Sequence, residues 1–229
     1  MDATASSILP ELSKISLHAP RSAQMEEARP PETTESDQKL MERYRAGDAT
    51  AFNELYRRYR APVRRFVAKL CWGQDEADEI VQEVWLAVIR GTRSYRPAAR
   101  FTTYLFSIAH RRLQDHWRSR GRRARAFAAA DSAPDLHEIA DAGATVPEDW
   151  AASAELRSAL MAAIDRLPPP QRAVFLLKAE ADLSLEEIAA ATGASVEATK
   201  SRMRYAVARL RAQLARHGNA GRRDRYERP

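Results

Sequence analysis

The sequence has a single cysteine and no long apolar run, and both absences narrow what the protein can be. Cys71 alone can form neither an intrachain disulfide nor a cysteine-based zinc site, which fits a reducing compartment. No stretch approaches the roughly 18 uncharged apolar residues that a membrane span requires, and no basic segment followed by an apolar one opens the chain. We therefore expect a cytoplasmic protein without membrane insertion.

Negative charge is outnumbered by positive charge outside the N-terminal segment. The 229 residues carry a net charge of +6, yet the first 36 hold six acidic and three basic side chains, so the remainder stands at +9. Such a remainder favours a polyanionic partner, nucleic acid before membrane, although charge alone would fit many ribosomal or tail-bearing proteins. Residues 1–36 are rich in Ser, Thr, Pro and Glu with few large apolar residues, so we expect a disordered tail.

The alternation of apolar and polar residues that marks a strand is missing from residues 37 to 125, where helical spacing takes its place. One helix should begin after the capping residue Asp48 and be kinked by Pro62. Two more should cover residues 76–90, ended by Gly91, and residues 102–120. The apolar stripe of the helix that follows Asp48 consists of Phe52, Leu55, Tyr56, Tyr59, Val63, Phe66, Val67 and Leu70.

The chain as a whole predicts an all-α fold with two helical modules joined by a flexible linker. The first module spans residues 37–121 and the second residues 148–216. Residues 122–147 are mostly Ala, Gly, Asp and Pro with little periodicity, which is typical of a linker. Residues 217–229 form a basic C-terminal tail.

The second module contains the pattern of a helix-turn-helix. Ser184 with Glu187 three residues later is a capping box that opens a short helix, Gly193 supplies the turn, and Ser195 caps a long helix expected to run to about residue 217. On that long helix Glu197, Lys200, Ser201 and Arg204 project away from the apolar stripe, so they could read or position DNA. A solvated basic face on a helical hairpin is the alternative interpretation. We favour DNA binding because caps, turn, apolar stripe and outward charges agree.

Acidic and amide side chains gather on one side of the helix at 76–90, where they would repel phosphates. We therefore weigh a protein partner against plain stabilisation of a helix N-terminus, which explains the first acids well and the later ones poorly. The residues of this acidic face are Asp75, Asp78, Glu79, Gln82 and Glu83.

Aromatic and cationic residues alternate from residue 95 to residue 118. Aromatic rings can stack on exposed bases and guanidinium groups can follow a backbone, which together suit single-stranded DNA. Phe101 could equally be plain core, and we expect His110 and Trp117 to be packing or surface residues. The candidate residues are Tyr95, Arg96, Phe101, Tyr104, Arg111, Arg112 and Arg118.

Three stretches in order resemble the sigma-70 family of RNA polymerase sigma factors, in its extracytoplasmic-function group. They are DEADEIVQEVWLAVIR (75–90), RFTTYLFSIAHRRLQDHWR (100–118) and residues 167–214, beginning LPPPQRAVFLLKAEADLSLEEIAAATGAS. The resemblance implies that the acidic face grips the clamp helices of the polymerase beta-prime subunit, and that residues 95–118 serve promoter melting and −10 recognition. It also implies −35 contacts for Lys178, Lys200, Ser201, Arg204 and Tyr205.

The resemblance implies further partners and leaves some specificity open. The expected partners are core polymerase, including its beta flap, promoter DNA and an anti-sigma factor, with no cofactor, no metal and no catalytic residues. Tyr104 stands where the family usually has Trp, and Arg111 stands where it often has Asn, so the base preference at −10 does not carry over. The alternatives are a helix-turn-helix regulator that acts without polymerase and, far behind, a nuclease or recombinase.

Overall fold

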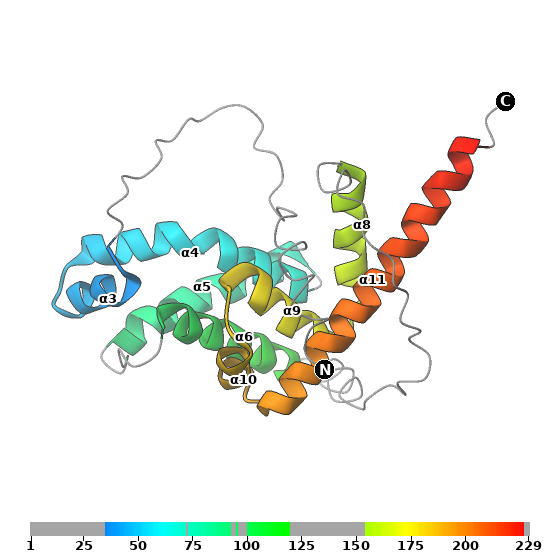
Figure 1. The fold of residues 1–229 in the computed structure, drawn as a ribbon. Coiled ribbons are helices and arrows are strands. Elements are labelled where there is room, and N and C mark those ends of the chain that lie inside the picture. The colour runs from blue at the N-terminus through cyan, green and yellow to red at the C-terminus, as the bar shows by residue number, and fades with distance from the viewer. Residues whose placement is uncertain (1–34, 72, 93–94, 96–99, 120–153, 227–229) are drawn as a thin grey trace.

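Every regular element among the described residues is a helix, so the predicted all-α fold is confirmed. The computed structural model describes residues 35–71, 73–92, 95, 100–119 and 154–226. The expected disordered tail and linker fall almost wholly outside these ranges. The first module holds α3 (Asp37–Arg45), α4 (Ala49–Leu70), α5 (Gln74–Gly91) and α6 (Phe101–Ser119), and the second holds α8 (Ala154–Asp165), α9 (Pro169–Ala181), α10 (Leu185–Thr192) and α11 (Val196–Tyr226) (Figure 1).

Local capping sets the helix starts in the first module. The side chain of Asp48 accepts a hydrogen bond from the Thr50 backbone N–H at 2.9 Å, so α4 begins where the sequence predicts. Pro62 lies inside α4 without ending it. The helix α5 ends at Gly91, as predicted. One expectation was wrong in detail, because Tyr56 is 40% exposed rather than inward.

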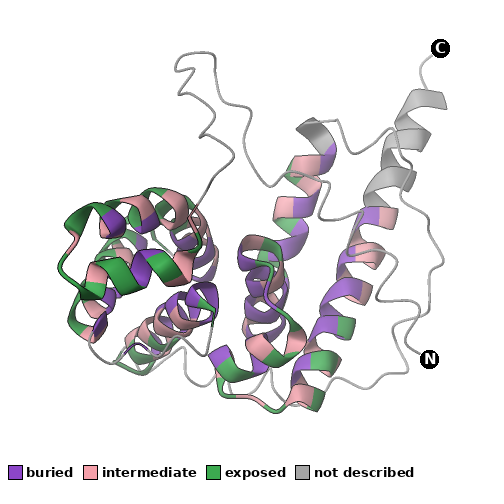
Figure 2. Ribbon diagram, turned by 60° about the vertical axis from the view of Figure 1, so that its left-hand side comes forward, coloured by how far each residue is buried: buried purple, intermediate pink, exposed green. Residues whose placement is uncertain are grey.

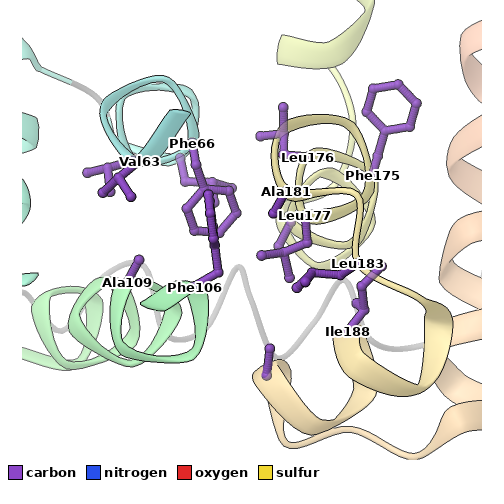
Figure 3. Close-up of a cluster of buried hydrophobic side chains, with 14 of the residues drawn as sticks. Val63, Phe66, Phe106, Ala109, Phe175, Leu176, Leu177, Ala181, Leu183 and Ile188 are labelled. Carbon is purple, nitrogen blue, oxygen red and sulfur yellow. The ribbon is translucent and has the colours of Figure 1, made fainter. Parts of the chain in front are cut away.

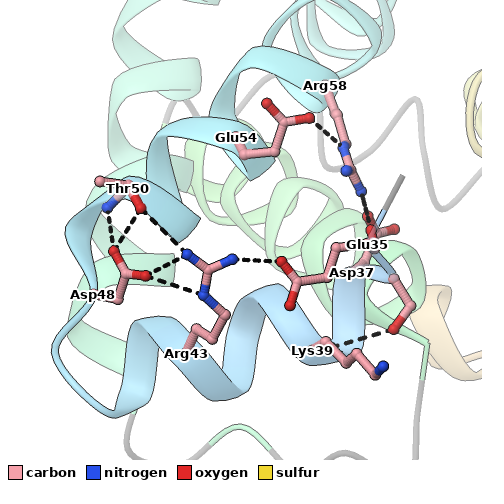
Figure 4. A network of polar contacts seen from close by, with 9 residues as sticks. Glu35, Asp37, Lys39, Arg43, Asp48, Thr50, Glu54 and Arg58 are labelled. Atoms are coloured by element: carbon pink, nitrogen blue, oxygen red, sulfur yellow. Dashed lines mark hydrogen bonds and ion pairs between the residues drawn. The ribbon is translucent and has the colours of Figure 1, made fainter. Parts of the chain in front are cut away.

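A polar network fixes α3 against the start of α4 (Figure 4). The Arg43 guanidinium donates to the carboxylates of Glu35 and Asp48, so it links the residues before and after α3. Arg58 of α4 donates to Asp37 at 2.8 Å, in the first turn of α3. These charge-assisted contacts hold α3 in place although few of its side chains are buried.

Caps set the helix ends in the second module as well. Pro168 is the N-cap of α9 and Pro169 its first residue, where a missing N–H costs nothing. The capping box of Ser184 and Glu187 is present, and Gly193 ends α10 at φ +70°, a conformation that L side chains rarely adopt. The long helix α11 does not stop near residue 217 as expected but continues to Tyr226.

The two modules are docked against each other and share one apolar core. In Figure 3 Phe66 of α4 and Phe106 of α6 lie across from Leu177 of α9 and Leu183, and all four belong to one buried cluster. Figure 2 shows buried residues on the facing sides of the helices and exposed ones on the outer sides. The sequence predicted two modules but not this docking, which brings surfaces from both halves of the chain together.

Candidate nucleic-acid and protein interfaces

The acidic face lies on the outer side of α5. All five of its residues are exposed, while Ala77, Ile80 and Val84 on the opposite side are fully buried. Asp78, with 58% of its side chain exposed, pairs with Arg64 of α4 at 3.0 Å. The neighbouring Glu76 is different. It is largely buried and lies 2.6 Å from the His116 ring. The face therefore presents carboxylates outward along about two turns of helix.

An apolar end continues this face, and the sequence reasoning missed it. Leu86 is 40% exposed and Ile89 is 42% exposed, at the helical spacing that extends the row through Gln82. Tyr56 of α4 is equally exposed and packs edge-on against Trp85 with ring centroids 4.9 Å apart. The signal was present in the spacing, since positions 75, 79, 82, 86 and 89 fall on one side of a helix. Acid and exposed apolar surface together are typical of a protein contact.

The aromatic candidates of the first module form a packed cluster. Tyr95 is 3% exposed and Phe101 1% exposed, with ring centroids 6.4 Å apart, so neither can stack on a base in this arrangement. Tyr104 is half-buried and meets Tyr95 at 5.1 Å in an edge-on contact. Burial raises the pKa of both tyrosines, so both rings are neutral. Of these three rings, Tyr104 is the one that is not fully packed away.

The cationic candidates of α6 are more accessible than the aromatic ones. Arg111 and Arg118 are exposed, Arg112 is half-buried, and Arg118 makes a 3.2 Å pair with Asp115. Arg96 lies outside the described residues. His110 and Trp117 are both buried, at 3% and 5% exposure, so they pack rather than face solvent.

The helix-turn-helix places its candidate residues on the outer side of α11. Lys200 and Arg204 are exposed, Ser201 is half-buried, and Lys200 lies 3.1 Å from Glu197 one turn earlier. Inward, Thr199 and Ala206 are fully buried.

Two further −35 candidates have different surroundings. Lys178, near the end of α9, pairs with Asp182 at 2.7 Å. Tyr205 is only 9% exposed and lies under Arg204, whose guanidinium carbon is 5.4 Å from the ring centroid. Tyr205 can therefore position Arg204 but has little surface of its own for DNA.

Two other kinds of site have no support in the described part of the chain. None of its helices is long and apolar enough to cross a membrane. Within the same residues, no group of three or more His, Cys, Asp or Glu side chains is placed to hold a metal ion. The acids of α5 thus form a row along one helix rather than a convergent cluster.

Comparison with known proteins assigns both modules. Sigma-70 region 2 matches residues 55–123 and sigma-70 region 4 matches residues 157–210. The RNA polymerase sigma factor CarQ of Myxococcus xanthus is 30% identical over 174 residues, covering 76% of this chain and 95% of CarQ. The ECF RNA polymerase sigma-E factor of Escherichia coli strain K12 is 33% identical over 178 residues, covering 73% of this chain and 88% of the Escherichia coli protein.

The fold is also seen in solved structures. The sigma factor RpoE of Bartonella quintana, solved in complex with the anti-sigma factor NepR, aligns with a TM-score of 0.54 at 23% identity, covering 72% of this chain and 96% of that one. Two matched regions in the family's order, with relatives similar over most of their length, leave one assignment: the chain belongs to the sigma-70 family of RNA polymerase sigma factors, in its ECF group.

Proposed function

We propose that this protein binds core RNA polymerase and directs promoter-specific transcription initiation, with region 4 on the −35 duplex and region 2 on separated −10 DNA. The observation that carries the proposal is the pairing of an exposed acidic face on α5 with a capped helix-turn-helix whose outer side carries Lys200 and Arg204. A regulator that bound DNA alone would have no use for the acidic face.

The acidic face is the proposed polymerase contact. Its carboxylates would repel DNA at short range, so the complementary surface is a basic one on a protein. Leu86 and Ile89 would add apolar contact at one end of the face. By family resemblance, the partner surface is the pair of clamp helices of the beta-prime subunit, with the beta flap meeting region 4.

Promoter DNA is proposed to meet the two modules in different ways. On α11, Lys200 and Arg204 can donate to guanine edges or phosphates in the major groove. On α6, Arg111 and Arg118 can follow the backbone of a separated strand, with the half-buried Tyr104 as the aromatic candidate on the same helix. Each contact is modest alone, but tethering both modules on one polymerase raises their effective concentration.

The proposed role also implies where the protein works and that it acts by binding. We propose that the protein works by binding and positioning in the cytoplasm, beside polymerase, with no chemistry of its own and no cofactor. The Bartonella sigma factor of similar fold was solved with an anti-sigma factor, and we propose that a protein of that kind restrains this chain as well.

Run-off transcription tests the proposal. Core polymerase from the source bacterium is incubated with a library of its genomic fragments, with and without the purified protein, and transcript 5′ ends are sequenced. The proposal predicts a discrete set of start sites that depends on the protein. Binding to duplex DNA without any such start site would instead favour a regulator that acts without polymerase.

A further inference from the structure

A pocket of about 480 Å³ opens between the end of α4 and the helices α8 and α9 (Figure 1). None of the residues proposed to contact polymerase or DNA lines it. Protein pockets that bind small molecules have volumes of roughly 300 to 1,000 Å³ and combine an apolar lining with a few polar groups. The size of this pocket therefore suits a small molecule, and its lining decides which kind.

Hydrocarbon side chains form one part of the lining. Ile164 of α8 and Leu176 of α9 are buried there, while Ala68 of α4 and Met161 of α8 are half-buried and pack against the same core. An apolar group that leaves water for such a surface gains affinity in proportion to the area it buries. This part of the pocket therefore favours a ligand with a hydrocarbon body.

Cations outnumber acids in the rest of the lining. Its charged residues are Arg64, Arg65, Lys69, Arg172, Asp165 and Glu180. Two of the cations are neutralised by direct pairs, because Arg65 lies 2.8 Å from Glu180 and Lys69 lies 3.0 Å from Asp165. The four cations and two acids leave the lining with a net charge of +2, so an anion is the favoured ligand.

Arg172 is one of the two remaining cations. It donates to the backbone carbonyls of Lys69 and Leu167, each at 3.0 Å, and to that of Asp165. These carbonyls lie at or near the ends of α4 and α8, whose partial negative charges favour a cation. Burial still lowers the pKa of Arg172, and the nearby Asp165 carboxylate opposes that shift only in part. An anion in the pocket would therefore stabilise a guanidinium that no carboxylate of the described residues binds directly.

Arg64 is the other remaining cation. With 53% of its side chain exposed, it lies 3.0 Å from Asp78, whose side chain is 58% exposed. An exposed pair of this kind contributes little to stability, so Arg64 can exchange Asp78 for a ligand at small cost. The guanidinium fork also matches the paired oxygens of a carboxylate or a phosphate. Arg64 is therefore available to bind an anionic head.

We propose that this pocket binds a small amphipathic anion, with its carboxylate or phosphate head on Arg64 and Arg172 and its hydrocarbon body on Ala68, Met161 and Leu176. A cationic ligand would be repelled by the net positive lining, and a neutral one would leave the excess cations without an anion. A mineral anion would gain nothing from the apolar part. Neither polymerase nor DNA takes part in this binding, so the site stands apart from the proposed function.

Isothermal titration calorimetry on the full-length protein tests the proposal. Octanoate and octyl phosphate are the probes, and the tighter of the two identifies the head. Octanol has the same body without charge, octylamine has the opposite charge, and acetate and inorganic phosphate have a head without the body. The tighter probe should bind at least about tenfold more strongly than each of these four compounds. Any of the four binding as tightly as the probe would overturn the proposal, because one part of the ligand, or the opposite charge, would then suffice.

A pair of charge variants locates the head. Arg64→Gln and its control Arg57→Gln each remove an exposed, paired cation of α4, since Arg57 is 55% exposed and lies 2.8 Å from Glu54. Arg57 is not part of the pocket lining. Arg64→Gln should weaken binding of the tighter probe at least about fivefold, and the control should stay within about twofold of the parent. Equal affinities in the two variants would contradict the proposal.

A pair of size variants locates the body. Ala68→Phe fills the apolar part of the pocket, whereas Ala61→Phe adds the same ring at an exposed position of α4 outside the lining. The first should weaken binding at least about tenfold and the second should leave it unchanged. Circular dichroism and thermal melting check that both proteins fold, and Arg64→Gln decides alone if Ala68→Phe does not. Unchanged binding by a folded Ala68→Phe protein would overturn the proposal.

Discussion

The acidic face of α5 and the outer side of α11 are both exposed helix surfaces, yet they carry opposite charge and meet different neighbours. The acids of α5 stand in a row that ends in Leu86 and Ile89, whereas α11 presents the cations Lys200 and Arg204, with Glu197 paired to Lys200. The difference shows that the two surfaces suit different partners: the acidic face of α5 suits a basic protein surface, and the outer side of α11 suits DNA.

Charge reversal on α5 should break this comparison most strongly. Glu79→Lys with Glu83→Lys places two cations where a basic partner is expected, so affinity for core polymerase should fall at least about 100-fold while duplex binding is kept. Affinity is measured by fluorescence anisotropy of labelled protein.

The matched control for that variant is Glu42→Lys with Asp115→Lys, two exposed acids of the same module that lie off the acidic face. An equal loss in the control would mean that only net charge matters. The assignment of the face would then be wrong.

The buried histidine His110, unlike the two exposed surfaces, should make the stability of the protein depend on pH. Burial, together with the charge of Arg202 on α11, lowers the pKa of His110 on α6 to about 4. A histidine in the unfolded chain has a pKa of about 6.5, so below that pH the unfolded state binds a proton that the native state does not. The free energy of unfolding therefore holds its full value above pH 6.5 and decreases as the pH falls towards 4. Between pH 7 and pH 5 the loss should be about 2 kcal/mol.

Urea unfolding of the parent and of His110→Leu at both pH values measures this effect. The variant should lose about 2 kcal/mol less of its unfolding free energy between pH 7 and pH 5 than the parent does. Parallel pH dependence in the two proteins would show that His110 titrates normally in the native state.

Removal of two cations from α11 tests the other side of the comparison. Lys200→Ala with Arg204→Ala should weaken binding to duplex promoter DNA roughly tenfold and lower the slope of affinity against salt by about 2. Polymerase affinity should stay unchanged. Arg166→Ala with Arg45→Ala removes two exposed cations elsewhere and should leave the duplex affinity as it was. An equal loss of duplex affinity in that control would mean that Lys200 and Arg204 act only through general electrostatic attraction.

The apolar end of the acidic face should give the smallest effect. Leu86→Ser with Ile89→Ser removes exposed apolar surface, so polymerase affinity should fall about fivefold, on the scale of about 1 kcal/mol. The melting temperature should hardly change because both side chains are exposed in the free protein. A large drop in melting temperature would place them in the core instead.

Local chemistry made much of the fold readable from the sequence. Asp48, Ser184 and Gly193 mark helix ends through hydrogen bonds and backbone conformations that involve a few neighbouring residues, and each was predicted. The end of α11 was missed because Gly218 lowers helix propensity without forbidding a helix, unlike proline.

Contacts between distant residues were beyond the sequence. Arg65 and Glu180 are 115 positions apart, and no periodicity connects them. The burial of Tyr95 and Phe101 depends on the same kind of tertiary packing, so the stacking role expected for them does not fit this structure. Their part in −10 recognition stays a prediction.

One run-off experiment tests the central claim most directly. Core polymerase is supplied with the parent protein, the α5 charge-reversal variant or the α11 double-alanine variant, on the same genomic fragments. The account predicts protein-dependent start sites with the parent, none with the α5 variant, and a strong reduction with the α11 variant. Start sites that persist undiminished with the α5 variant, or a parent that binds duplex DNA and starts no transcript, would contradict it.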